Sequence, residues 1–163
     1  MGAFVDRDGA RRIVGRFATA QRDGQEYLAA DAPELVLDDT VRAKLAQIAA
    51  QLAQHTTAGV EFGGKRFAID DRSVGRIVSR AVFARACIDG ADQWNDEVSG
   101  WIAIDNTRPS FTAAEFWEFA KAAQLHVTAL TLNARSLKDA VLAAAAAGDL
   151  EALAAIDPST GWE

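Results

Sequence analysis

The sequence is poor in residues that carry covalent or metal-based chemistry. Of its 163 residues, one is a cysteine, Cys87, and two are histidines. A single thiol excludes an internal disulfide and supplies too few ligands for a thiolate metal cluster. Cys87 lies in an apolar, helix-like stretch, so we interpret it as a buried and inert thiol. We therefore expect no metal and no cofactor.

Long apolar runs and an excess of positive charge are also missing. The most apolar run, Val141 to Ala147, consists mostly of alanine and is far shorter than the ~18 residues that cross a bilayer, so we expect no membrane insertion. The 17 basic residues face 23 acidic ones, a net charge of -6, which does not attract nucleic acid. Residues 1–8 lack the basic and apolar pattern of a secretory signal, and we expect none.

Half of the residues are apolar, enough for one sizeable core or two small ones joined by a helix. Residues 10–20 mix β-branched, aromatic and basic side chains, and an Asp-Gly turn dipeptide stands on either side. This pattern predicts a strand over 10–20, with residues 25–28 as its candidate partner. Pro33 then breaks the pattern, because the residue before a proline is pushed out of helical geometry.

Apolar residues recur at three- and four-residue steps from Val41 to Leu52, which predicts a helix over residues 37–56 with Asp38 or Asp39 as its cap. We expect this helix to connect a small β module, residues 1–36, to an α+β domain, residues 57–163.

Two glycines, Gly63 and Gly64, separate short strand-like runs and predict a tight hairpin over residues 60–69. A helix with an arginine-bearing face, Arg72, Arg76 and Arg80, should follow. Residues 94–104, with a tryptophan in each arm, suggest a second hairpin.

The longest periodic segment begins after Phe111. Thr112 and Glu115 have the spacing of a capping box, and Phe111 that of a hydrophobic staple. The periodicity continues to Gly148, and a helix of some thirty residues would be about 45 Å long, more than one small sheet can cover. Part of it should face a partner. Asp149 should cap a last short helix, and Trp162 should anchor the closing turn. The predicted fold class is α+β, with a small N-terminal β module, a connecting helix, and β-hairpins packed with helices including one long C-terminal helix.

Groups suited to catalysis are scarce. His55 and His126 have no nucleophile at motif spacing, so His55 is interpreted as a helix-end residue and His126 as a packed or interface residue. Three acidic pairs, at residues 38–39, 70–71 and 96–97, suit glycoside hydrolysis or a divalent ion in principle. They stand beside helix starts or turns, where acidic residues are expected anyway. We assign no catalytic residue and expect a protein that is not an enzyme.

Aromatic residues are the remaining candidates for binding. A cluster of Trp94, Trp101, Phe116, Trp117 and Phe119 could form a sugar platform, but adjacent Phe116 and Trp117 cannot both point inward from one helix. We favour contact with a neighbouring subunit or with the sheet. The candidate interface residues are Phe116, Trp117, Phe119, His126, Leu130, Leu137 and Trp162.

Residues 60–162 resemble an uncharacterised domain family of tailed-phage and prophage proteins, found among tail-fibre and tail-assembly proteins. The resemblance rests on VEFGGKRFAIDDRSVGRIVSRAV, SGWIAID, FTAAEFWEFAKAAQLHV and LKDAVLAAAAAGDLEALAAIDPSTGW, in that order. More weakly, RRIVGRFATA and GQEYLAADAPEL resemble the β module that opens small tail-fibre assembly proteins. The alanine run and Gly148 depart from the family pattern. The resemblance implies a place in the phage tail or its assembly, and it brings no catalytic residues.

The expected function is a non-enzymatic bacteriophage tail component, at the baseplate or tail fibre, in the virion tail or in the host cytoplasm during assembly. Its expected partners are other phage tail or fibre proteins and copies of itself in a symmetric assembly. A tail-fibre assembly chaperone that is absent from the mature virion is the alternative. A small hydrolase and a glycan-binding receptor protein are further alternatives.

Overall fold

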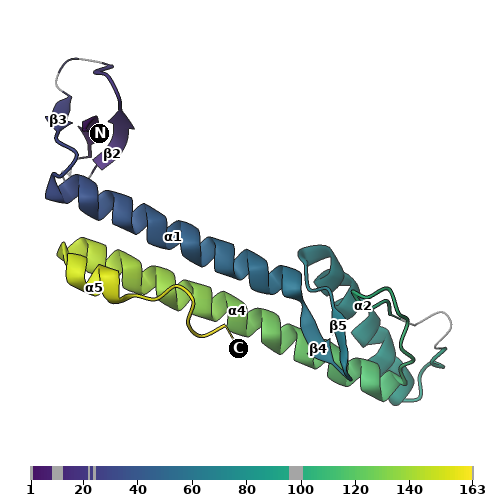
Figure 1. Ribbon diagram of the computed structural model, residues 1–163. Coiled ribbons are helices and arrows are strands. Elements are labelled where there is room, and N and C mark those ends of the chain that lie inside the picture. The colour runs from purple at the N-terminus through teal and green to yellow at the C-terminus, as the bar shows by residue number, and fades with distance from the viewer. Residues whose placement is uncertain (1, 9–12, 22, 24, 96–100, 163) are drawn as a thin grey trace. The chain divides into compact units, whose positions relative to one another are not determined.

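The computed structural model describes residues 2–8, 13–21, 23, 25–95 and 101–162. Their fold is α+β, as predicted: an N-terminal sheet, helices, a β-hairpin and a long C-terminal helix (Figure 1). The chain forms two compact units, one from Met1–Ile48 and Leu137–Pro158, the other from Ala49–Ser136 and Ser159–Glu163. The predicted division into residues 1–36, 37–56 and 57–163 stays a prediction.

The first unit begins with a three-stranded antiparallel sheet in the order β2-β1-β3. Its strands are β1 (Ala3–Arg7), β2 (Ile13–Phe17) and β3 (Glu26–Leu28). The predicted pairing of residues 10–20 with 25–28 is wrong, because β1 lies between β2 and β3 and pairs with both. Ala3 and Val5 alternate toward a small core, which fits the central strand of a sheet with one covered face.

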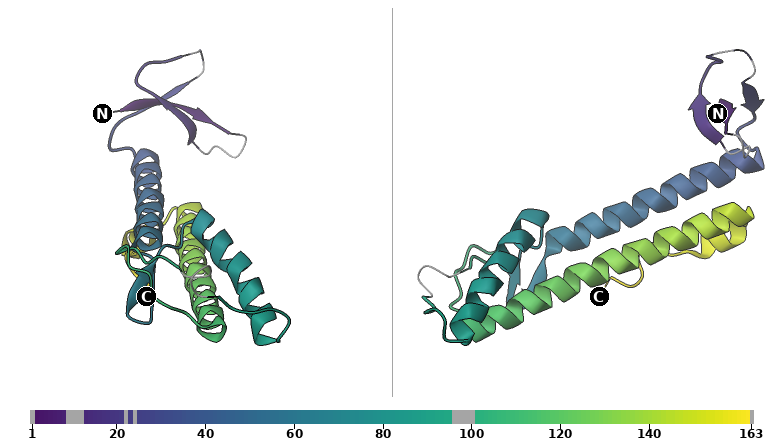
Figure 2. Two further views of the ribbon diagram at one scale, coloured as in Figure 1. Left: turned by 90° about the vertical axis from the view of Figure 1, so that its right-hand side faces the viewer. Right: turned by 180° about the vertical axis from the view of Figure 1, so that it is seen from behind.

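Helix α1 (Pro33–Ala58) starts earlier than predicted. Proline suits the first turn of a helix because its nitrogen needs no hydrogen-bond partner there and its fixed φ is close to helical. Pro33 therefore begins α1, whereas we expected it to interrupt regular structure. Asp38 and Asp39 therefore lie in the second turn and are not caps. Leu35, in the first turn, packs against the inner face of the sheet. Figure 2 shows this sheet beside the first turns of α1.

The first unit is completed by the end of α4 (Ala113–Ala147) and by α5 (Leu150–Ala155). Gly148 ends α4 with a φ of 67°, and the amides of Gly148 and Asp149 each donate over 3.0 Å, to Ala145 and Ala144 respectively. This is the Schellman pattern of a helix end. Asp149 caps α5, as predicted, by accepting from the Ala152 amide at 2.9 Å. Lys44 of α1 donates to the carbonyls of Ala154 and Ile156 and so holds the end of α5.

The second unit contains the predicted hairpin, built from β4 (Val60–Phe62) and β5 (Lys65–Phe67). Gly63 and Gly64 have φ values of 58° and 73°, the positive angles that a two-residue hairpin loop of this kind needs. Helix α2 (Asp71–Ile88) follows, capped by Asp70, whose carboxylate accepts from the Ser73 amide at 3.0 Å.

The predicted second hairpin lies partly outside the described residues, since these do not include residues 96–100. Its described parts, residues 94–95 and 101–104, contain no strand. One backbone hydrogen bond, from the Ile104 amide to the Arg66 carbonyl at 2.8 Å, joins the second of these parts to β5.

The start of α4 confirms the capping box. Thr112 Oγ1 accepts from the Glu115 amide at 3.2 Å, and Glu115 Oε2 accepts from the Thr112 amide at 2.8 Å. The rings of Phe111 and Phe116 lie 5.7 Å apart, which completes the staple. At the chain's end Trp162 is buried and stacks on His55 with a centroid distance of 5.4 Å, so the predicted aromatic anchor is confirmed.

Candidate interaction site

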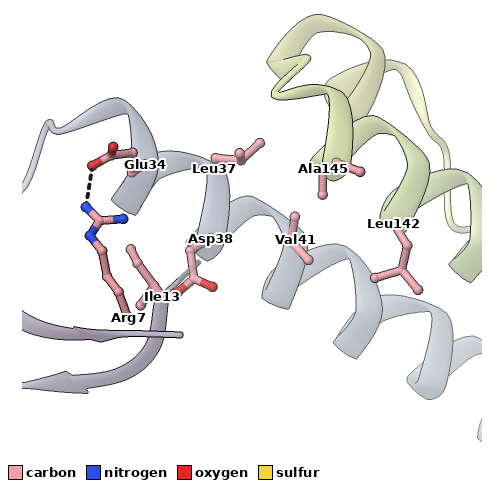
Figure 3. Close-up of a pocket in the computed structure, with 9 residues that line it drawn as sticks. Arg7, Ile13, Glu34, Leu37, Asp38, Val41, Leu142 and Ala145 are labelled. Carbon is pink, nitrogen blue, oxygen red and sulfur yellow. Dashed lines mark hydrogen bonds and ion pairs between the residues drawn. The ribbon is translucent and has the colours of Figure 1, made fainter. Parts of the chain in front are cut away.

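A cleft of about 520 Å³ opens in the first unit between the sheet, the first turns of α1 and the last turns of α4 (Figure 3). The residues that line it are Arg7, Ile13, Glu34, Leu37, Asp38, Val41, Leu142, Ala145 and Ala146.

Most of this lining is aliphatic, for reasons that lie in the two helices. Leu37 and Val41 are four residues apart and so share one face of α1. The alanine run of α4 contributes Ala145 and Ala146, whose small side chains fill little of the space between the helices. A groove with apolar walls remains, of the kind that receives an apolar side chain or the ridge of another helix.

Ion pairs hold the sheet to α1 at the polar end of the cleft. Arg7 Nε donates to Glu26 at 2.8 Å, and its Nη2 donates to Glu34 at 3.0 Å. The hydrogen bond that Arg7 donates to Glu26, and then the one it donates to Glu34, raises the pKa of the Arg7 guanidinium. Because Arg7 is paired with two carboxylates within the chain, it is not available as an unpaired cation for a ligand at this end of the cleft.

A second ion-pair group involves the acidic pair at Asp38 and Asp39. Arg16 donates to the carboxylates of both residues: its Nη2 lies 3.1 Å from Asp39 Oδ2, and its Nη1 lies 3.3 Å from Asp38 Oδ2. Its hydrogen bond lowers the pKa of Asp39 below the usual 3.8. Arg42 Nε lies 3.1 Å from Asp38 on the same helix. This acidic pair is therefore engaged in fastening β2 to α1.

The other acidic pairs have different surroundings. Asp70 is the cap of α2, and hydrogen bonds from the Ser73 side chain and then its amide lower the pKa of Asp70. Asp71 is the first residue of that helix. The pair at residues 96–97 lies outside the described residues. Within the described part of the chain, no three potential metal-ligating side chains gather at one place.

The predicted interface residues divide by burial. Phe116, Phe119, Leu130 and Trp162 are buried within this chain, whereas Trp117, His126 and Leu137 are half-buried. Their role at an interface stays a prediction.

The aromatic cluster of the second unit joins most of the tryptophans and phenylalanines noted in the sequence. The Phe116 ring lies 5.6 Å from Trp94, 5.7 Å from Trp101 and 5.4 Å from Phe119. Trp117 points elsewhere, with the Arg85 guanidinium 6.0 Å from its ring centre. The two adjacent aromatic residues thus face different surroundings, as helix geometry requires.

The cleft residues Arg7, Ile13 and Leu142 did not emerge from the sequence. The alternation of buried and partly exposed side chains over residues 3–7 is a local signal for β1, but it is short, and no turn dipeptide precedes it. The cleft itself needs residues more than a hundred positions apart, and no local pattern brings these together.

These features define an α+β protein with a largely apolar cleft built by a sheet and two helices. A family model described as a domain of unknown function (DUF4376) matches residues 39–160, and the chain belongs to this family. The predicted membership of an uncharacterised domain family is thereby confirmed. No curated protein and no solved structure matches the chain. None of the described helices is both long and apolar enough to span a membrane.

Proposed function

We propose that this chain is a non-enzymatic component of a bacteriophage tail, at the baseplate or the tail fibre, that works through protein–protein contacts. The resemblance of residues 60–162 to tail proteins supports the location. The partners are other tail or fibre proteins, or further copies of this chain in a symmetric assembly.

The observation that carries the contact function is a second apolar stripe on α4. Phe116, Phe119, Ala123 and Leu130 form its buried face in the second unit. On the opposite face Leu125 and Leu132 are 71% and 63% exposed.

Leu125 and Leu132 are seven residues apart, with Ala129 between them on the same face, which is the spacing of a helix–helix seam. Burying one leucine side chain contributes about 1.5–3 kcal/mol, so a partner that covers both would gain substantially. The opposite face of α4 already supplies the residues that the helix buries within the second unit. The stripe, which we call the outer leucine stripe, therefore supports a contact with another helix.

Mass spectrometry of purified virions beside the infected-cell lysate tests the location. We expect peptides of this chain in particles at a fixed ratio to a known tail protein. The second candidate function is a tail-fibre assembly chaperone, and the net charge of -6 favours such a transient partner. A chain that is required for infectivity, present in the lysate and missing from particles would be this chaperone. Absence from particles combined with unchanged infectivity of a deletion phage would contradict both.

A further inference from the structure

The outer face of the N-terminal sheet carries one aromatic residue on each strand. Phe4 of the central strand pairs with Phe17 of β2 and with Tyr27 of β3. Residues that pair directly across strands point to the same side, so the three rings form one row across the sheet. The Phe4 and Tyr27 rings meet edge to face at 5.2 Å. The core of the first unit, with Val5 and Leu28, lies on the other face.

Two glycines allow these rings to lie over the backbone. A Cβ at Gly15 would approach the Phe17 ring to 3.0 Å, and one at Gly2 would approach the Tyr27 hydroxyl oxygen to 2.3 Å. Any larger residue would push the rings up and away from the sheet. Tyr27 is 59% exposed, while Phe4 and Phe17 are half-buried. The three rings therefore form a partly exposed aromatic row on the outer face of the sheet, here called the aromatic platform.

A polar pair borders the platform. Gln25 Nε2 donates to Asp6 Oδ1 at 3.0 Å, and Gln25 Oε1 accepts from the Gln21 amide at 2.6 Å. Asp6 pairs with Gly15 across the sheet and so belongs to the outer face. Arg7, Arg16 and Glu26 lie on the inner face, where they form their ion pairs. Within the three described strands, Asp6 is the one charged side chain on the platform's side.

The size of the platform argues against a protein partner. Three strands about 4.8 Å apart, two of five residues and one of three, cover at most roughly 240 Å² at 3.3 Å per residue. A stable protein–protein interface buries about 800 Å² on each partner. Nucleic acid is disfavoured as well, because base stacking is normally combined with cations that neutralise phosphates, and this face supplies a carboxylate instead.

We propose that the aromatic platform binds a neutral saccharide. A sugar ring presents an apolar C–H face and a rim of hydroxyl groups, and the platform offers both complements. The rings of Phe4, Phe17 and Tyr27 cover the C–H face, while Asp6, Gln25 and the tyrosine hydroxyl bond the rim. The row spans two strand spacings, about 10 Å, which suits two or three linked sugar units. This activity is independent of the proposed tail function.

Nuclear magnetic resonance on the full chain tests this proposal. The ¹⁵N-labelled protein is titrated with maltohexaose and, separately, with chitohexaose. We expect saturable shifts with at least one of them, confined to residues 2–6, 15–17 and 25–27. The dissociation constant should be on the order of 1 mM, because an open platform buries little of its ligand.

Tyr27→Ala should weaken binding about fivefold through the loss of one stacking ring, and Phe17→Ala similarly. Asp6→Asn keeps the shape and tests the hydrogen bonds to the sugar. Val82→Ala, at an exposed position of α2 in the second unit, is the control and should bind as the wild type does. Thermal melts of each variant separate a binding defect from a folding defect.

Two results would overturn the proposal. One is the absence of shifts in these segments at ten times the expected dissociation constant with both oligosaccharides. The other is a shift of the same residues with protein concentration alone and no further change on adding sugar, which would make the platform a contact between copies of the chain.

Discussion

At the scale of single residues, the first unit depends on arginines of the sheet that reach α1. Arg7 and Arg16 stand on different strands, yet both bond carboxylates in the first two turns of the helix. Arg16 faces inward because it pairs with Val5, whereas the bulge between Asp6 and Arg7 changes the register after Gly15, so that Arg7 pairs with Ile13. These ion pairs fix the position of the sheet against α1, and through it the polar end of the cleft.

The Arg16–Asp39 pair predicts a pH dependence of stability. Arg16 lowers the pKa of Asp39 in the folded chain, so the pair stabilises the fold above pH 3.8, the ordinary value. This stabilisation is lost as the pH falls through the lowered pKa of the folded state. In urea unfolding, Arg16→Gln should be less stable than the wild type at pH 7, and the difference should shrink toward pH 2.

Arg66→Gln is the matched control for that comparison. Arg66 lies 3.5 Å from Glu61, and both side chains are more than half exposed, so its loss should change stability little at either pH. A difference between Arg16→Gln and wild type that stays constant from pH 7 to pH 2 would contradict the role given to Asp39.

At the scale of elements, glycines mark where helices end and where they are weak. Gly148 has a φ of 67° at the end of α4, whereas Gly75 lies within α2 with open space where a Cβ would stand. The same substitution should therefore have opposite effects at the two positions. Gly148→Ala should destabilise the chain by about 1 kcal/mol, and Gly75→Ala should stabilise it by up to about 1 kcal/mol. Chemical denaturation of both variants checks the signs, and equal signs would contradict this account.

Elements with local signals were predictable from the sequence. The hairpin at Gly63 and Gly64, the capping box at Thr112 and the end of α4 at Gly148 each depend on residues within a few positions. The start of α1 and the pairing of β1 were not predictable in this way. Pro33 is compatible with either a break or a helix start, and the choice depends on Leu35 packing under the sheet.

The candidate sites could not be predicted from local sequence patterns either. The cleft joins β1, α1 and the end of α4, and the platform joins three strands through their register, so neither is visible in a local pattern. The aromatic residues that did stand out in the sequence, Phe116 and Phe119 above all, are buried in the second unit.

At the scale of the whole molecule, the family match and the candidate surfaces overlap only in part. The match covers residues 39–160, which include the outer leucine stripe and, of the cleft lining, Val41 and the residues from α4. The cleft residues Glu34, Leu37 and Asp38 lie outside it. The sheet and its aromatic platform lie outside the matched residues. The proposed contact through the outer leucine stripe therefore falls within the family domain, and the proposed saccharide binding falls outside it.

The most direct test of the contact function is the double variant Leu125→Glu/Leu132→Glu in the phage genome. Both side chains are exposed, so the variant should fold and melt like the wild type, while a partner would have to bury two carboxylates. Gln124→Glu/Thr131→Glu adds the same charge at two exposed positions with the same seven-residue spacing, beside the stripe, and serves as the control. We predict that the leucine variant falls at least about tenfold in quantitative mass spectrometry of purified particles while the control is retained. Retention of the folded leucine variant at the wild-type level would contradict the claim that this stripe is where the chain meets its partner.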